Sequence, residues 1–298
     1  MTEKINIITL SKILRTYYDV QKLRVAVENR VKLTRFTLCP NGHLIPLKSG
    51  ERKTCPICGE PVKIISQEPD PLLTEVSEKL VEIEKGLLYA YLERDVSEDA
   101  LWKAYLRKIK GIGPVLGDYL VRILNPARFD TVSKMWKYSG LHVVDGKAPR
   151  RTAGQKVDWS PFARTMAWKI GESFRKVGGF YRMMYEKFFD ECRVKHKDWT
   201  AAHCLNHARR VTVKLFLAHY HYVGRKILGL PVREPYSCVV KPHECIPPIL
   251  DRASEEDRKA FYHLYLKDTW TWQTYNSWNL AYFRWLKEKE IEKEETEE

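Results

Sequence analysis

Hydrophobic residues recur at steps of three and four along most of the chain, which is the spacing of one face of an α-helix. This pattern predicts one helix over Ile5–Phe36 and a second over Leu72–Leu92, each with a narrow apolar stripe and many charges. The run Pro69-Asp70-Pro71 predicts the start of the second helix. Because neither helix buries its stripe alone, we expect the two to pair as an antiparallel hairpin with residues 39–66 at its tip.

The remainder of the chain is also predicted to be mainly helical. A capped helix start is expected at Asp95 and Ser97, and helical spacing continues to Ile227 with several breaks. Residues Gly229–Pro248 contain five prolines and are expected to form an irregular loop, followed by an aromatic helix over Asp251–Lys289. The predicted fold class is mainly α, with three regions at 1–95, 96–235 and 236–298.

Charge is distributed unevenly along the chain. The net charge is +13, and the stretch Lys147–Lys226 contains 18 Lys and Arg against 6 Asp and Glu. The tail from Lys287 is acidic instead, with 3 Lys and 7 Glu. A basic field of this size attracts polyanions such as nucleic acids. A solvated basic face with no partner is the alternative.

The sequence shows no signal-peptide pattern at its start and no apolar run long enough for a membrane span. Seven cysteines are an odd number, and they occur in clusters, which favours available thiols and a reducing compartment. The expected location is therefore the cytoplasm of a prokaryote, with an archaeal, phage or mobile-element origin left open.

Two short turns contain the residues of a metal site. Cys39-Pro-Asn-Gly-His43 and Cys55-Pro-Ile-Cys58-Gly supply two soft ligands each, as a tetrahedral zinc ion requires. We therefore predict a structural Zn²⁺ bound by Cys39, His43, Cys55 and Cys58, in a zinc-ribbon-like clip at the tip of the helical hairpin. Unconnected buried cysteines are the alternative.

Two weaker clusters leave a second metal site open. His203 and His207 are four residues apart on one predicted helix, a spacing that also suits buried histidines or phosphate contacts. Cys238, His243 and Cys245 lie close together in the proline-rich segment.

A glycine-rich turn predicts a contact with phosphate. The stretch from Leu106 to Leu120, with Gly111-Ile112-Gly113 at its centre, resembles a helix–hairpin–helix motif. In such a motif the backbone amides of the turn and of the next helix face a phosphate. Lys108 and Lys110 flank the turn and suit contacts with a nucleic-acid backbone. A helical turn that merely contains glycine is the alternative.

Further candidate contacts lie in the basic stretch. The segment Gly140–Trp159 holds four cations, and the later helix around Arg209, Arg210 and Lys214 is cationic on one side and apolar on the other. An aromatic run near the C-terminus has the spacing of a core, with a platform for stacked bases as the alternative. The candidate nucleic-acid contacts are Lys108, Lys110, Gly111, Gly113, Lys147, Arg150, Arg151, Lys156, His203, His207, Arg209, Arg210 and Lys214.

Several stretches resemble known RNA-guided proteins. The segments 109–114, 125–129 and 138–141, the basic loop and the helix 159–174 are similar to the C-terminal domain of the DEDD-type, bridge-RNA-guided insertion-sequence transposases. Residues 203–219 are similar to the small helical RNA-binding domain of the Nop proteins, in which a helical hairpin also precedes that domain. The chain thus resembles the Nop-like, RNA-guided Tas proteins.

This resemblance covers roughly residues 100–235 and implies a guide RNA and RNA-guided binding of DNA. The chain departs from the transposases in two respects. They begin with a RuvC-like nuclease domain, whereas this chain begins with the helical hairpin and the cysteine turns. Their nucleophilic serine follows the Gly-Leu element, but between Gly140 and Trp159 this chain offers only Thr152, with Ser160 beyond it in a helix-capping position. No catalytic residue is therefore assigned.

The favoured hypothesis is a nucleic-acid-binding protein that binds RNA and, guided by it, DNA, without intrinsic nuclease activity. The alternatives are a transposase or site-specific recombinase of the bridge-RNA insertion-sequence family and an architectural DNA-binding protein. The expected partners are RNA and DNA, and a homodimer is plausible because long helical hairpins often pair with a second copy.

Overall fold

The computed structural model describes residues 2–47, 50–89, 94–144, 146–234 and 245–297. Contacts divide the chain into two compact units, Met1–Arg94 and Asp95–Glu298. Helices dominate, and the strands that are described form one small sheet, so the predicted mainly α class is confirmed. Within the described residues, no helix has both the length and the apolar character needed to cross a membrane.

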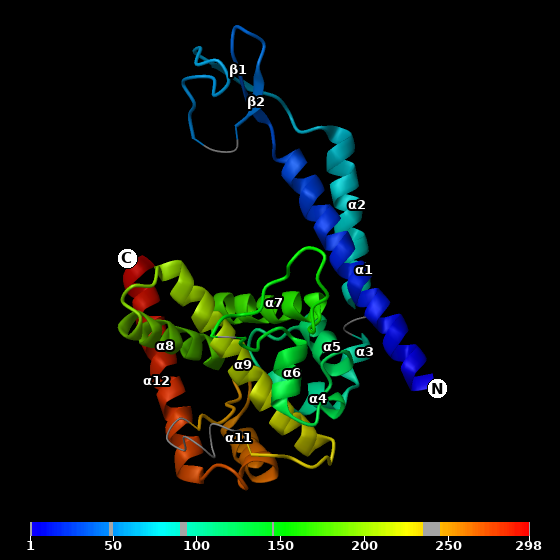
Figure 1. The fold of residues 1–298 in the computed structure, drawn as a ribbon, viewed down its shortest axis with the longest axis vertical. Helices are drawn as coiled ribbons and strands as arrows, with labels where there is room; N and C mark the ends of the chain where they lie inside the picture. Colours follow the sequence, from blue (N-terminus) through cyan, green and yellow to red (C-terminus); the bar gives the residue numbers. More distant parts are fainter. Residues whose placement is uncertain (1, 48–49, 90–93, 145, 235–244, 298) are drawn as a thin grey trace. The chain divides into compact units, whose positions relative to one another are not determined.

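The first unit contains two long helices that lie side by side, α1 (Thr2–Val31) and α2 (Pro71–Leu87) (Figure 1). A polar contact joins them, since Glu84 of α2 accepts a hydrogen bond from Gln21 Nε2 at 2.8 Å and forms an ion pair with Arg24. Among the side chains of these helices that the structure describes, the buried apolar ones are Leu14, Tyr17, Val27 and Leu80.

The ends of these helices differ in part from the prediction. The helix α2 begins at Pro71 as predicted, because Asp70 caps it by accepting a hydrogen bond from the Leu73 amide at 3.0 Å. The α-helix ends at Leu87 and continues as a π-turn through residues 88 and 89, and the rest of the predicted helix, residues 90–92, lies outside the described part. The helix α1 ends at Val31, so its predicted continuation to residue 36 is wrong.

A three-stranded antiparallel sheet replaces the last part of the first predicted helix. Its order is β2-β1-β3, with β1 (Arg35–Leu38), β2 (Leu44–Pro46) and β3 (Lys63–Ser66). The register places Phe36 opposite Ile65 and opposite Pro46. Pairing on both sides therefore extends the backbone after residue 34, where the local pattern alone favours a helix.

The second unit is built around one long helix, α9, which contacts α4, α6, α7 and α8 as well as two short helical turns (Figure 1). Its elements are α3 (Arg94–Ser97), α4 (Ala100–Ala104), η2 (Leu106–Lys108), α5 (Pro114–Arg122), η3 (Pro126–Arg128), α6 (Val132–Tyr138), α7 (Pro161–Val177), α8 (Phe180–Lys195), α9 (Ala201–Ile227), α11 (Glu255–Phe261), η5 (Tyr262–Leu266) and α12 (Trp272–Glu297).

Two details of this unit differ from the sequence prediction. The cap of α4 is Asp99, which accepts a hydrogen bond from the Leu101 amide at 2.7 Å, and not the predicted pair at 95 and 97. The C-terminal helix predicted over 251–289 is split into α11, η5 and α12. Several of its aromatic side chains are buried and form core, as their spacing indicates: Trp270, Tyr275 and Tyr282.

A chain of buried hydrogen bonds crosses the core of the second unit. The hydroxyls of Tyr105 and Tyr181 are 3.1 Å apart, and the Tyr181 hydroxyl lies 2.8 Å from His219 Nδ1. His219 Nε2 lies 2.9 Å from the carbonyl oxygen of Ile246, which can only accept. The imidazole therefore donates from Nε2 and accepts from Tyr181 at Nδ1, which is the bonding of a neutral histidine.

Candidate metal centre and candidate nucleic-acid interface

Four side chains of the first unit converge as the spacing of the two turns predicts. One ligand atom from each of Cys39, His43, Cys55 and Cys58 lies within 4.8 Å of the other three. Cys39 Sγ is 3.4 Å from His43 Nδ1 and 3.7 Å from Cys58 Sγ, and Cys55 Sγ is 3.7 Å from His43 Nδ1. No carboxylate belongs to this group, so the described ligand set is three sulfurs and one nitrogen.

Each of the two turns that hold these side chains is closed by the backbone amide of a glycine. In the first, the Gly42 amide donates to the Cys39 carbonyl at 3.0 Å; in the second, the Gly59 amide donates to the Cys55 carbonyl at 2.8 Å. Both glycines have positive φ angles, 80° and 76°, which glycine adopts without strain. The first turn joins β1 to β2, so the sheet fixes one pair of ligands relative to the other.

The thiol of Cys55 ionises more readily than an ordinary cysteine thiol. Burial raises its pKa, but the backbone amides of Cys58 and Ile57 and the neighbouring thiols outweigh burial and lower the pKa to about 6. A thiolate is the form of cysteine that binds a metal. This cluster can therefore hold a cation that prefers sulfur and nitrogen.

The glycine-rich turn of the second unit faces the protein interior more than the sequence predicts. Gly111 has a φ of 95°, and a Cβ added there would lie 2.9 Å from the ring of Phe174 on α7. The Gly111 carbonyl accepts a hydrogen bond from Ser173 Oγ at 2.6 Å. By contrast, Gly113 caps α5 and is exposed, with no atom within 4 Å of an added Cβ. Only the Gly113 side of the turn remains open to a ligand.

The two lysines beside this turn differ from each other in their contacts. The backbone amide of Lys110 donates to Asp251 Oδ2 at 2.7 Å, and the amide of Phe180 donates to Asp251 Oδ1 at 2.6 Å. A half-buried carboxylate of the protein itself therefore occupies the backbone amide directly before the glycine turn. Lys108 is mostly buried, and its ammonium lies 3.7 Å from Asp257.

The loop between α6 and α7 presents the most accessible cations among the predicted contacts. Lys147, Arg150, Arg151 and Lys156 are all exposed. Within the described part of the chain, none of the four forms an ion pair with an acidic side chain. Asp158, an acid of this segment, pairs instead with Lys137 at 2.9 Å. Among the described residues, no acid therefore neutralises the charge of these four side chains.

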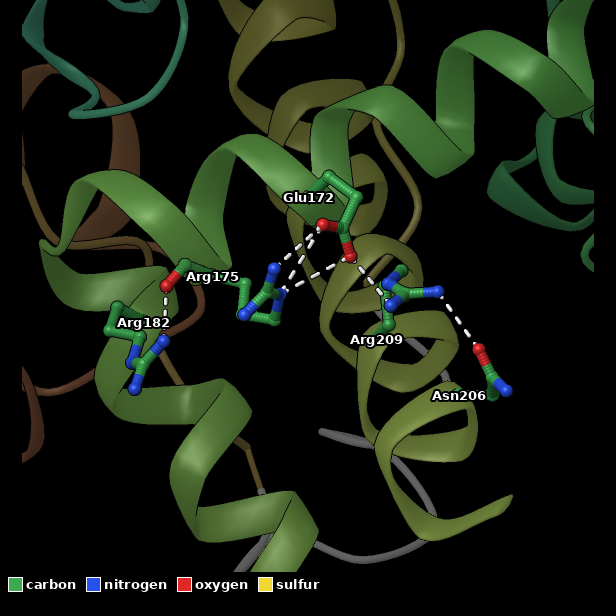
Figure 2. Close-up of polar contacts among 5 residues, drawn as sticks. All are labelled: Glu172, Arg175, Arg182, Asn206 and Arg209. Carbon is green, nitrogen blue, oxygen red and sulfur yellow. Dashed lines mark hydrogen bonds and ion pairs between the residues drawn. The ribbon is translucent and has the colours of Figure 1, made fainter. Parts of the chain in front are cut away.

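Arg209, another predicted nucleic-acid contact, forms an ion pair within the protein. Its guanidinium lies 2.5 Å from Glu172 Oε1 of α7, with only 16% and 12% of the two side chains exposed (Figure 2). Arg175 also donates to Glu172, at 3.0 Å, and Arg209 donates to Asn206 at 2.9 Å. Hydrogen bonds from Arg175, together with the charge of Arg209, lower the pKa of Glu172. Arg209 is therefore a structural cation of the contact between α7 and α9.

Its neighbour Arg210 is placed differently. Arg210 Nη1 is buried and has no hydrogen-bond partner among the described residues. Burial, followed by the positive charge of Arg164, lowers the pKa of Arg210. Burial and the charge of Arg210 likewise lower the pKa of Lys214, and burial lowers that of Arg164. Three cations of α7 and α9 thus repel one another in a partly buried place.

Sequence reasoning identified Arg210 and Lys214 but missed Arg164 and the aromatic residues beside the cluster. The Arg164 guanidinium lies 4.8 Å from the ring centre of Trp159, and Lys214 Nζ lies 4.3 Å from that of Trp136. The available signal was an arginine early in α7, whose first turn contains no acidic residue. That signal is weak without knowledge of which helix faces α7.

The two predicted histidines surround an indole ring. His203 stacks on Trp199 with ring centres 4.0 Å apart, and His196 stacks at 4.1 Å. His207 meets the edge of the same ring at 5.7 Å. Among the described residues, the only cluster of three or more potential metal ligands is the one in the first unit.

The other cysteine cluster falls partly outside the described residues, which exclude Cys238 and His243. Cys245 is disulfide-bonded and therefore offers no thiolate to a metal.

Comparison of the chain with protein-family models, with curated proteins and with solved structures found no match. Its function has to be inferred from the residues and their geometry.

Proposed function

We propose that this chain is a nucleic-acid-binding protein whose second unit binds the phosphate backbone. The observation that carries the proposal is the set of four exposed cations in the α6–α7 loop that form no ion pair with an acid among the described residues. Cations that a protein leaves unpaired near one another repel, and a polyanion relieves this repulsion with release of its own counterions. In addition, Gly113 is exposed at the N-terminus of α5, and backbone amides at a helix N-terminus suit a phosphate.

Zn²⁺ is the metal that fits the cluster of the first unit best. Tetrahedral zinc with Zn–S bonds of about 2.3 Å and Zn–N bonds of about 2.0 Å places sulfurs about 3.8 Å apart and sulfur and nitrogen about 3.5 Å apart. The observed Sγ···Sγ distance of 3.7 Å and the Sγ···N distances of 3.4 and 3.7 Å match these values. With four protein ligands the site is structural, a zinc-ribbon-like clip at the end of an α1–α2 coiled-coil hairpin.

Elemental analysis of the purified chain tests the metal. We expect about one zinc per chain, and loss of it in the Cys39→Ser variant but not in Cys192→Ser, which changes a buried cysteine of the second unit. A metal-free wild-type chain that keeps its thermal unfolding transition unchanged after addition of Zn²⁺ would exclude the site.

RNA as the ligand, and RNA-guided binding of DNA, follow from the resemblance to the Nop-like Tas proteins. Under this proposal the chain has no nuclease activity of its own. The transposase alternative requires a nucleophile, and Ser160 Oγ is engaged as the cap of α7, accepting a hydrogen bond from the Ala163 amide at 3.2 Å. The architectural alternative requires only duplex DNA. Sequencing of RNA that copurifies with the chain tests the guided form, which absence of an enriched small RNA would refute.

Fluorescence anisotropy with labelled structured RNA, single-stranded DNA and duplex DNA over a range of salt tests nucleic-acid binding itself. We expect the double variant Arg150→Ala, Arg151→Ala to weaken binding and to reduce the slope of log K against log salt by about 0.7 for each lost phosphate contact on single strands. The matched control is Lys103→Ala with Lys259→Ala, which removes the same charge from exposed lysines that pair with acids of their own.

Three results would decide the matter. Equal loss of affinity in the control and the loop variant would show that net charge alone matters and would remove the loop from the interface. No measurable binding of any probe at low salt would refute the function. Preference for duplex DNA over structured RNA would favour the architectural alternative. The expected homodimer remains a prediction that sedimentation of the full chain tests.

A further inference from the structure

Arg164, Arg210 and Lys214 form a cluster of positive charge that no acidic side chain neutralises in the part of the chain that the structure describes. Arg210 and Lys214 are four residues apart on α9 and so share one face, and Arg164 comes from the beginning of α7, which packs on α9. The groups that act on the charges of Arg210 and Lys214 are other cations, not carboxylates. Such an arrangement destabilises the protein when no anion is present.

Two indole rings hold the cluster in place. Trp159, which is 8% exposed, lies beside the guanidinium of Arg164, and Trp136 lies beside the ammonium of Lys214. The Trp136 indole nitrogen also donates to the Lys214 carbonyl at 3.1 Å. The rings fix the directions of the two cations, but a neutral ring offsets only part of the cost of burying a charge.

The preceding residue of α9, Arg209, has the acidic partner that the cluster lacks. Arg209 and Arg210 are both half-buried, and the protein supplies Glu172 for Arg209 at 2.5 Å (Figure 2). For Arg210 no such acid is present, and its Nη1 remains buried without a partner in the described structure. Buried donors of native proteins are nearly always satisfied, so an unsatisfied guanidinium nitrogen among like charges marks a place for an anion.

The exposed loop connects directly to this cluster. Arg164 Nη1 donates to the carbonyl oxygen of Pro149, the residue that precedes the exposed pair Arg150 and Arg151. This hydrogen bond therefore holds the loop backbone against Arg164 directly before the exposed cations. A single small anion would use only the recess, whereas a chain of phosphates could use the recess and the loop together.

We propose that Arg164, Arg210 and Lys214 form a recessed site for one phosphate group of a bound nucleic-acid strand, with neighbouring phosphates on Arg150 and Arg151. A guanidinium presents paired N–H donors to two phosphate oxygens, and the lysine adds a third cation. This inference rests on the proposed function and deepens it, because it assigns a fixed position on the protein to one phosphate.

The variants Arg210→Gln and Lys214→Gln test this site through two independent readouts. Removal of a cation that the protein does not neutralise should leave the thermal unfolding temperature of the ligand-free chain unchanged or raise it. The same change should weaken binding of the labelled RNA or DNA by about 10-fold or more. The control for charge is Lys187→Gln, an exposed lysine of α8 that pairs with Glu191, and its affinity should stay within about twofold of wild type.

The contrast for structure is Arg209→Gln, which should lower the unfolding temperature because it leaves Glu172 partly buried with one partner fewer. If Arg210→Gln lowers the unfolding temperature as much and leaves affinity intact, Arg210 is a structural cation and the phosphate site is wrong. In that case wild-type binding still supports the proposed function.

Inorganic phosphate serves as the probe that separates the two proposals. We expect phosphate to raise the unfolding temperature of wild type and not that of Arg210→Gln, at constant ionic strength set with chloride. Phosphate protection together with RNA binding that depends on Arg210 supports the site as proposed. Phosphate protection in a chain that binds no nucleic acid would overturn the assignment to a nucleic-acid phosphate. Absence of both effects would overturn the site altogether.

Discussion

The buried histidine of α9 gives a prediction about acid stability whose size follows from its surroundings. His219 is 2% exposed, accepts at Nδ1 from Tyr181 and donates from Nε2 to the Ile246 carbonyl. Burial, opposed only in part by the hydrogen bond to Ile246, lowers its pKa to about 4 from the ordinary value of 6.5. The folded protein therefore holds this side chain neutral at a pH where the unfolded chain protonates it.

The sign and the size follow from proton linkage. Because the pKa of His219 is lower in the folded protein than in the unfolded chain, its contribution to the free energy of unfolding is fully present above pH 6.5. This contribution is lost as the pH falls toward about 4. Each pH unit between these two values is worth about 1.4 kcal/mol, so the free energy of unfolding should fall by about 3 kcal/mol over this range from this residue alone. Carboxylates add their own dependence in the acid part of the range, so a matched variant is needed.

The variant His219→Gln keeps an amide donor for Ile246 but does not titrate. Urea unfolding followed by tryptophan fluorescence reports on the second unit alone, because all nine tryptophans lie after residue 95. We expect the curve of unfolding free energy against pH to be flatter in His219→Gln than in wild type between pH 6.5 and 4.5. The exposed His263→Gln serves as the control and should follow wild type.

Parallel curves for wild type and His219→Gln over this range would refute the reasoning, whatever the absolute stability of the variant. A direct titration of the wild-type imidazole by NMR gives a second measurement, in which a midpoint near the ordinary value of histidine would have the same consequence.

Three further predictions concern the second unit, and fluorescence-monitored unfolding checks the first two. Glu172→Gln should destabilise the unit by about 2 to 4 kcal/mol, because it leaves two partly buried arginines without their carboxylate; an unchanged unfolding free energy would contradict this. Gly117→Ala should cost about 1 to 3 kcal/mol, because its Cβ would lie 2.4 Å from the ring of Trp102. Cys192 and Cys204, whose sulfurs are 2.6 Å apart and buried, should lose two thiol hydrogens to an added disulfide-forming oxidant such as diamide and become crosslinked; peptide mass spectrometry that finds both thiols free would contradict this.

Local patterns in the sequence were sufficient for most helices and for the metal cluster. The start of α2 depends on Pro71 and its cap Asp70, which are neighbours in the chain. Each pair of metal ligands lies within one turn of five residues, so the spacing alone brings Cys39 and His43 together. Elements fixed by contacts between residues that are close in the sequence can be predicted without knowledge of the fold.

The errors arise where distant segments meet. Residues 35 and 36 continue the helical pattern of α1, yet they form β1 because β2 and β3 pair with them on both sides. Lys110 was expected to contact a nucleic-acid backbone beside the glycine turn, but its amide is bonded to Asp251, far along the chain. In both cases the partner that decides the structure is chosen by the tertiary fold, which a local pattern does not contain.

The tertiary fold also decides which cations of the basic stretch Lys147–Lys226 are available to a ligand. A count of Lys and Arg in the sequence does not distinguish Arg209 from Arg210, since the two are adjacent and equally charged. The fold separates them, because α7 places the acid Glu172 against Arg209 and the cation Arg164 near Arg210. A cation neutralised by the protein gains little from a ligand phosphate, since it would have to give up its own carboxylate first. Affinity for a polyanion should therefore follow the uncompensated cations of the recess and the loop, and not the formal charge of the segment.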